Sequence, residues 1–146
     1  MKRRISAEHG SAILEFLIIG VLVLVPLLYI TLTVLRVESA VFASTQAVRE
    51  AARAFMMADS PTQGRYAAIA AARLAMSDQG FDMPDSALTI SCNELCLSPG
   101  SATHLRLDWR VDLPWVPPLV EGERLGYPIS VDSDVRVDSY RSDVSP

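Results

Sequence analysis

The chain is poor in the residue types that most often build active sites. Its 146 residues include two histidines, His9 and His104, and two cysteines, Cys92 and Cys96. No lysine follows Lys2, which excludes a polymer held by lysine isopeptide bonds anywhere after the first few residues. The serine, histidine and aspartate residues form no recognisable nucleophile arrangement. The composition therefore predicts a protein that is not an enzyme and that needs no cofactor.

Basic charge is scarce outside the amino-terminal end. The formal net charge is −4; residues 1–10 carry three basic residues and one acid, and the remainder carries 10 basic and 16 acidic residues. This acidic remainder argues against a nucleic-acid partner, which requires a basic surface. Because basic flanks stay on the cytoplasmic side of a membrane, we expect a cytoplasmic amino terminus and an exported carboxyl-terminal part.

One uncharged apolar run dominates the amino-terminal third. It covers residues 16–35, and a bilayer requires about 20 apolar residues. The run predicts a transmembrane helix over residues 11–35 that contacts membrane lipid, with a bend at Pro26 because proline lacks an N–H. Glu15 immediately precedes the run. An ionisable group is costly in a bilayer, so Glu15 is a candidate functional residue.

The helical pattern continues beyond the apolar run. Residues 36–57 contain neither glycine nor proline, which predicts a helix extension and a total length of roughly 70 Å at about 1.5 Å per residue. Residues 59–64 read as a break, and residues 65–79 as a second helix capped by Gly80. The apolar positions of the extension that fall near helical spacing are Val37, Val41, Val48, Ala52 and Phe55.

After Gly80 the apolar residues alternate with polar ones in three stretches, at residues 88–92, 105–111 and 129–138. This period of two predicts half-buried strands in an antiparallel sheet. Together with the helices it predicts an α+β fold, with an extracytoplasmic domain over residues 65–146. His104 and several aspartates fall on the polar face, where we expect them to be solvated. Calcium binding by those aspartates is unsupported by loop spacing, so we predict no metal site.

The sequence around Gly10-Ser11 and Glu15-Phe16 resembles the processing site of type IV pilin-like precursors, and most closely that of the TadE-like minor pilins (pseudopilins) of tight-adherence pili. The resemblance covers residues 8–57. It implies a leader of residues 1–10, removed by a prepilin peptidase that cuts after Gly10, and assembly through Glu15 and Phe16. It also implies sibling pilins and a pilus assembly platform as partners. Serine after the cleavage site, and Pro26 within the helix, depart from better-known type IV pilins.

Cleavage at this site has a direct electrostatic consequence. It creates a free amine on Ser11, which the carboxylate of Glu15 neutralises from within the chain or from a neighbouring subunit. Such a pair is much stronger in a low-dielectric helix bundle than in water, and leaving either partner alone is costly. The pair therefore favours one axial offset between packed helices.

Two other interpretations compete with this one. Val41-Phe42-Ala43 is a candidate secretory cleavage site, although secretory apolar regions of 7–15 residues are shorter than this run. Alternatively, the helix is an uncleaved single-pass anchor that tethers an extracytoplasmic binding module without any filament role.

The remaining candidates lie in the carboxyl-terminal half. Cys92 and Cys96 lack the second ligand pair of a structural zinc site, and in an exported domain such a pair predicts a disulfide; the alternative is two buried or free thiols. The apolar loop at residues 115–119 is either a subunit contact or a cover that completes the core.

Overall fold

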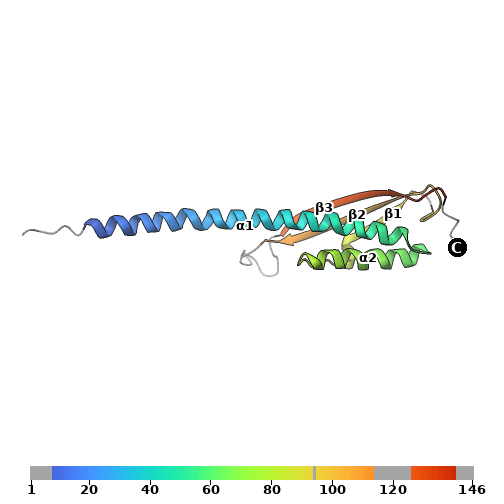
Figure 1. Cartoon of the computed structure of the whole chain (residues 1–146), viewed down its shortest axis with the longest axis horizontal. Coiled ribbons are helices and arrows are strands. Elements are labelled where there is room, and N and C mark those ends of the chain that lie inside the picture. The colour runs from blue at the N-terminus through green and yellow to red at the C-terminus, as the bar shows by residue number, and fades with distance from the viewer. Residues whose placement is uncertain (1–7, 94, 114–125, 141–146) are drawn as a thin grey trace, which may run out of the picture. The chain divides into compact units, whose positions relative to one another are not determined.

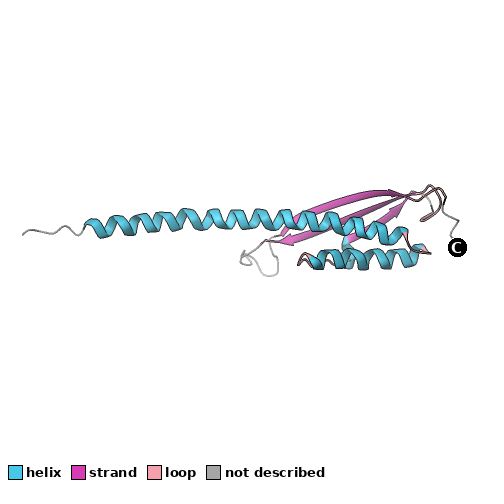
Figure 2. Cartoon of the chain, viewed as in Figure 1, coloured by secondary structure: helices cyan, strands magenta, loops and turns pink. Residues whose placement is uncertain are grey.

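The computed structural model describes residues 8–93, 95–113 and 126–140, with side chains from residue 12 onwards. The elements, in order, are α1 (Glu8–Met56), α2 (Pro61–Asp78), the 3-10 turn η1 (Asp85–Ala87), β1 (Leu88–Cys92), β2 (Ala102–Asp112) and β3 (Gly126–Arg136). The fold is α+β, as predicted (Figures 1 and 2). The chain divides into two compact units, Met1–Leu35 and Arg36–Pro146.

The three strands form one antiparallel sheet in the order β1-β2-β3 (Figure 2). Ile90 lies opposite Leu105, and Leu107 lies opposite Val131. Because side chains alternate between the two faces of a strand, this register collects the apolar residues of all three strands on one face. The prediction of alternating antiparallel strands is confirmed, although β2 and β3 begin a few residues earlier than the alternation alone indicates.

The apolar face of the sheet forms a single core with both helices. Leu105 and Leu107 of β2, Phe55 of α1 and Met76 of α2 are all fully buried in this cluster. The opposite face of the sheet is mostly exposed and carries charged side chains such as Arg106 and Asp132. The fold of residues 36–146 therefore has helices over one sheet face and polar side chains on the other.

The part of α1 that follows Leu35 is a core helix, not a separate extension. Its buried face is built largely from small residues, which allow close approach to the sheet: Ala40, Ala43, Ser44, Ala47 and Ala51. Val48, Ala52 and Phe55 are buried as the helical spacing predicts, whereas Val41 is 41% exposed. The spacing was wrong for Val41 because the buried stripe is centred on the alanines, one position away.

Local capping explains the limits of α2. Ser60 is the N-cap, and its side chain accepts a hydrogen bond from the Gln63 N–H, while Pro61 occupies the first turn, where a missing N–H costs nothing. The helix thus begins at Pro61, four residues before the predicted start at Arg65. At the other end Gly80 has φ +75°, and Phe81 N–H donates to the Met76 carbonyl. This is a Schellman motif, and it confirms Gly80 as the cap.

Two aromatic residues join α1 to the sheet. Trp109 Nε1 of β2 donates to Ser44 Oγ of α1 at 2.8 Å, and that hydroxyl donates to the Ala40 carbonyl at 2.7 Å. The Phe81 ring packs edge-on against Trp109, with centroids 5.5 Å apart, and the Arg36 guanidinium lies 4.4 Å from the Phe81 centroid. These contacts give the Ser44 hydroxyl and the Trp109 N–H hydrogen-bond partners, and they link the start of the domain helix to the sheet.

Candidate functional site

The amino-terminal unit presents its apolar side chains outward. Among the described residues α1 is the one helix long and apolar enough to cross a membrane by length and composition. Its exposed side chains include Phe16 at 75% and Leu22 at 70%. A water-soluble protein rarely exposes an apolar surface this continuous, and by length and composition the helix could span a membrane.

The two threonine hydroxyls of this unit are hydrogen-bonded in a way that suits lipid. Thr31 Oγ1 donates to the Leu27 carbonyl and Thr33 Oγ1 to the Tyr29 carbonyl, both at 2.9 Å. Both bonds stay within the helix, as a bilayer demands. The helix also continues through Pro26, although proline cannot donate to the carbonyl four residues earlier.

Glu15 is the one acidic residue of α1 from Ala12 to Leu35, the part whose side chains are described. It is exposed, and within the described part of the chain its carboxylate forms no hydrogen bond and no ion pair. Phe16 beside it is exposed as well. Gly10 and Ser11 both lie in the first turns of α1, within the same helical segment as Glu15. A group that would complement the carboxylate must therefore come from outside the described residues or from another molecule.

The polar face of the sheet holds a second gathering of charged groups. His104 Nδ1 lies 2.7 Å from Asp134 Oδ1, and these two side chains and Asp132 place ligand-type atoms within 4.8 Å of one another. His104 does lie on the polar face, as predicted, but it is hydrogen-bonded to Asp134. The strand register alone brings the three residues together, and exposed acidic groups commonly gather without a metal, so we assign no metal to them.

Arg106 and Asp108 form an ion pair on the same face, with Nε and Oδ2 2.8 Å apart. The hydrogen bond from Arg106 holds the pKa of the Asp108 carboxyl below its ordinary value, and Ser130 assists. Both groups are exposed, so the pair contributes little to stability.

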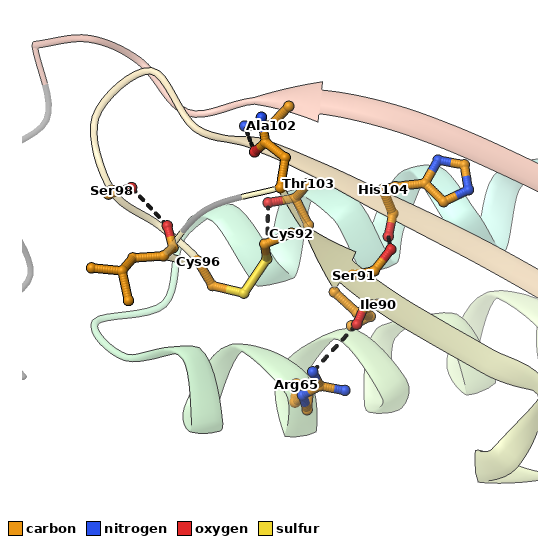
Figure 3. The surroundings of a disulfide bond; sticks show 11 residues. Arg65, Ile90, Ser91, Cys92, Cys96, Ser98, Ala102, Thr103 and His104 are labelled. Carbon is orange, nitrogen blue, oxygen red and sulfur yellow. Dashed lines mark hydrogen bonds between the residues drawn. A yellow bond between two sulfur atoms is a disulfide. The ribbon is translucent and has the colours of Figure 1, made fainter.

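The disulfide joins Cys92, the last residue of β1, to Cys96 (Figure 3). The loop that it closes leads into Leu97, which is fully buried although its φ is 66°. Thr103 Oγ1 lies 3.7 Å from the Cys92 sulfur, and Ser98 Oγ donates to the Leu95 carbonyl. Leu97 is thus part of the core, and the disulfide before it and the Ser98 hydrogen bond after it support its positive φ.

Replacing both Cys92 and Cys96 with alanine should lower the free energy of unfolding by about 2 kcal/mol, because so short a loop restricts the unfolded chain only modestly. Urea unfolding of the full chain in detergent measures the change. In the native protein kept under oxidising conditions both sulfurs should resist alkylation until a reductant is added. Readily alkylated thiols in that protein would contradict the disulfide.

One side-chain contact between α1 and β2 could not be predicted from the sequence. The hydrogen bond between Ser44 and Trp109 has no local signal, since the two residues are 65 positions apart. The apolar loop at residues 115–119 lies outside the described residues, so both interpretations of it stay open.

Comparison of the chain with protein-family models, with characterised proteins and with solved structures gave no match in any of the three.

Proposed function

We propose that this protein is a structural pilin-like subunit, a minor component or initiator of a tight-adherence-type pilus. The observation that supports this best is Glu15: an exposed carboxylate at the start of an apolar membrane-length helix, without a partner among the described residues. A plain anchor has no use for such a charge, whereas an assembling subunit does. The polymer would be non-covalent and the protein would not be an enzyme.

The processing chemistry follows from the residues ahead of Glu15. A prepilin peptidase would cut after Gly10 on the cytoplasmic side and leave a protonated amine on Ser11. In the assembled bundle the Glu15 carboxylate of one subunit would pair with the Ser11 amine of its neighbour. Because a buried charge without a partner is costly, this pair would select one axial offset between adjacent helices.

The proposed topology follows the charge distribution. The basic leader would stay in the cytoplasm, and the domain that begins at Arg36 would be exported, where the Cys92–Cys96 disulfide is stable. Partners in the membrane would be the peptidase, the assembly platform, sibling pilins and lipid. A reporter fused to the carboxyl terminus, of a kind that works only after export, should therefore show activity.

A membrane-anchored binding module is the second candidate. It is favoured by the compactness of residues 36–146, which form a separate unit with a buried core of their own. Such a module would need its helix only as a tether. Neither cleavage after Gly10 nor the charge of Glu15 would then matter to its function.

Gly10→Val tests the proposed processing. The added side chain should crowd the peptidase site, so that uncleaved precursor accumulates and recovery in surface filaments falls at least tenfold. Gly20→Val is the matched control, because a Cβ at Gly20 meets no atom within 4 Å and the change keeps the helix apolar. Immunoblots of membrane and sheared fractions measure both quantities. Normal cleavage of Gly10→Val would count against a pilin-type precursor.

A further inference from the structure

Within residues 8–93, 95–113 and 126–140, the outer edge of β3 presents backbone groups without a partner. β3 is 11 residues long and, among the described strands, pairs with β2 alone. Just beyond it, the N–H and carbonyl of Val137 both bond to the β2 side, at Ser101 and Gly100. Since residues alternate between the two edges of an antiparallel strand, Asp132, Asp134 and Arg136 direct their N–H and carbonyl groups outward.

The position of proline agrees with this assignment. Pro128 falls on the same alternation as Asp132 and Asp134, so its missing N–H lies on the outer edge, where no ladder bond is lost. From Ser130 onward the outer edge has no such block. An exposed edge of this length is a template for another strand.

The other edge of the sheet is closed in comparison. β1 is only five residues long, and Arg65 of α2 donates from Nη2 to the outward carbonyl of Ile90 at 3.3 Å (Figure 3). An arriving strand would have to displace this bond. The opportunity for strand addition is therefore confined to β3.

A groove lies beside the carboxyl-terminal part of this edge. It has a volume of about 760 Å³ and is lined by residues 134–138, Tyr140 and two methionines at the end of α1, Met56 and Met57. The side chain of Met57 is 76% exposed and that of Tyr140 is 94% exposed. The groove thus offers apolar contacts next to free backbone groups, which is the combination that binds an extended peptide.

Charge decides between a second copy of this chain and a different partner. Antiparallel pairing of two β3 strands centred anywhere from Asp132 to Asp134 places an aspartate of one copy opposite an aspartate of the other, which is unfavourable. Pairing with the β1 edge of a second copy meets the bond from Arg65. The groove carries Asp134 and Asp138 against a single cation, Arg136, so a basic segment complements it.

We propose that the outer edge of β3 and its groove bind an extended basic segment of a different polypeptide, which adds to the sheet as a fourth strand. Its basic side chains would face Asp132 and Asp134, and its intervening aliphatic side chains would face Met57 and Val135. This binding does not depend on filament assembly, so it stands or falls separately from the pilin-like function.

The test uses the full chain in detergent micelles and a short fluorescent peptide that alternates lysine and valine. Fluorescence anisotropy should show saturable binding, and the matching glutamate–valine peptide should not bind. Asp134→Pro removes an outward N–H and leaves the backbone bonds to β2 in place, while its side-chain bond to His104 of β2 is lost; it should raise Kd at least about tenfold. Asp132→Lys should also weaken binding several-fold. Asp108→Lys, an equal charge change on the central strand, is the matched control and should have less effect than Asp132→Lys.

Thermal unfolding of each variant shows whether it folds. If Asp134→Pro does not fold, the comparison of Asp132→Lys with Asp108→Lys decides. An unaltered Kd in folded Asp134→Pro would overturn the proposal, and so would equal binding of the two peptides or equal weakening by both lysine variants. Displacement of the peptide by self-association of the chain would identify a second copy as the occupant and would likewise overturn it.

Discussion

Replacing Glu15 with alanine should abolish recovery of the chain in sheared surface filaments while leaving membrane insertion and cleavage after Gly10 intact. Insertion depends on total apolarity, and removing a charge makes the helix more apolar. Assembly should fail because the Ser11 amine of the neighbouring subunit would lose its partner. Removing one partner of a buried ion pair costs about 3–5 kcal/mol, which corresponds to a hundredfold or greater loss of assembly.

Two further variants make this result specific. Glu15→Asp should be intermediate, since the charge remains but its reach is shorter. Glu38→Gln removes a carboxylate from the exposed surface of the same helix beyond the apolar run, and it should assemble normally. The measurement is the ratio of chain in sheared filaments to chain in the membrane pool. Normal assembly of Glu15→Ala would favour the plain-anchor interpretation.

Phe55→Ala should lower the free energy of unfolding of the domain by about 3–5 kcal/mol, the usual cost of removing a buried aromatic ring. Phe55 is 1% exposed and lies where α1, α2 and the sheet share one core. Phe42→Ala is the matched control, because Phe42 is on the same helix and 76% exposed, and its effect should stay within about 0.5 kcal/mol. Urea unfolding followed by near-UV circular dichroism measures both.

A double-mutant cycle sharpens the prediction for Phe55. A Cβ added at Gly64 would lie 2.9 Å from Cδ2 of the Phe55 ring, so Gly64→Ala alone should destabilise the domain by about 1–3 kcal/mol through overpacking. In the Phe55→Ala background the same methyl group enters the vacated space, and its cost should fall or reverse. Simple additivity of the two changes would mean that Phe55 and Gly64 are not in contact.

The parts of the fold that could be predicted from sequence are those with local signals. Alternation of apolar and polar residues predicted all three strands. Gly80 was predicted to end a helix because glycine adopts a positive φ without steric cost. The predicted start of α2 at Arg65 is wrong because Ser60-Pro61, which is typical of a break, is also typical of a helix start.

The parts that could not be predicted depend on contacts between distant residues. Burial of the alanine face of α1 depends on contact with the sheet, and alanine alone gives only a weak apolar signal. The more apolar Val41 therefore entered the predicted buried face in place of the neighbouring Ala40. The closed edge of β1 and the free edge of β3 depend on strand order, which alternation does not specify. For the candidate site, the sequence identified Glu15 and its helix, whereas the groove beside β3 required the register of three strands.

The most direct test of the proposed function is the intact mass of the unaltered chain, extracted from membranes of cells that contain an active prepilin peptidase. A pilin-like precursor predicts a mature chain that begins at Ser11, and it predicts that the full-length chain persists when the peptidase is absent. A stable chain that still begins at Met1 in the presence of the peptidase would contradict the proposal, and one that begins at Ser44 would indicate secretory cleavage instead.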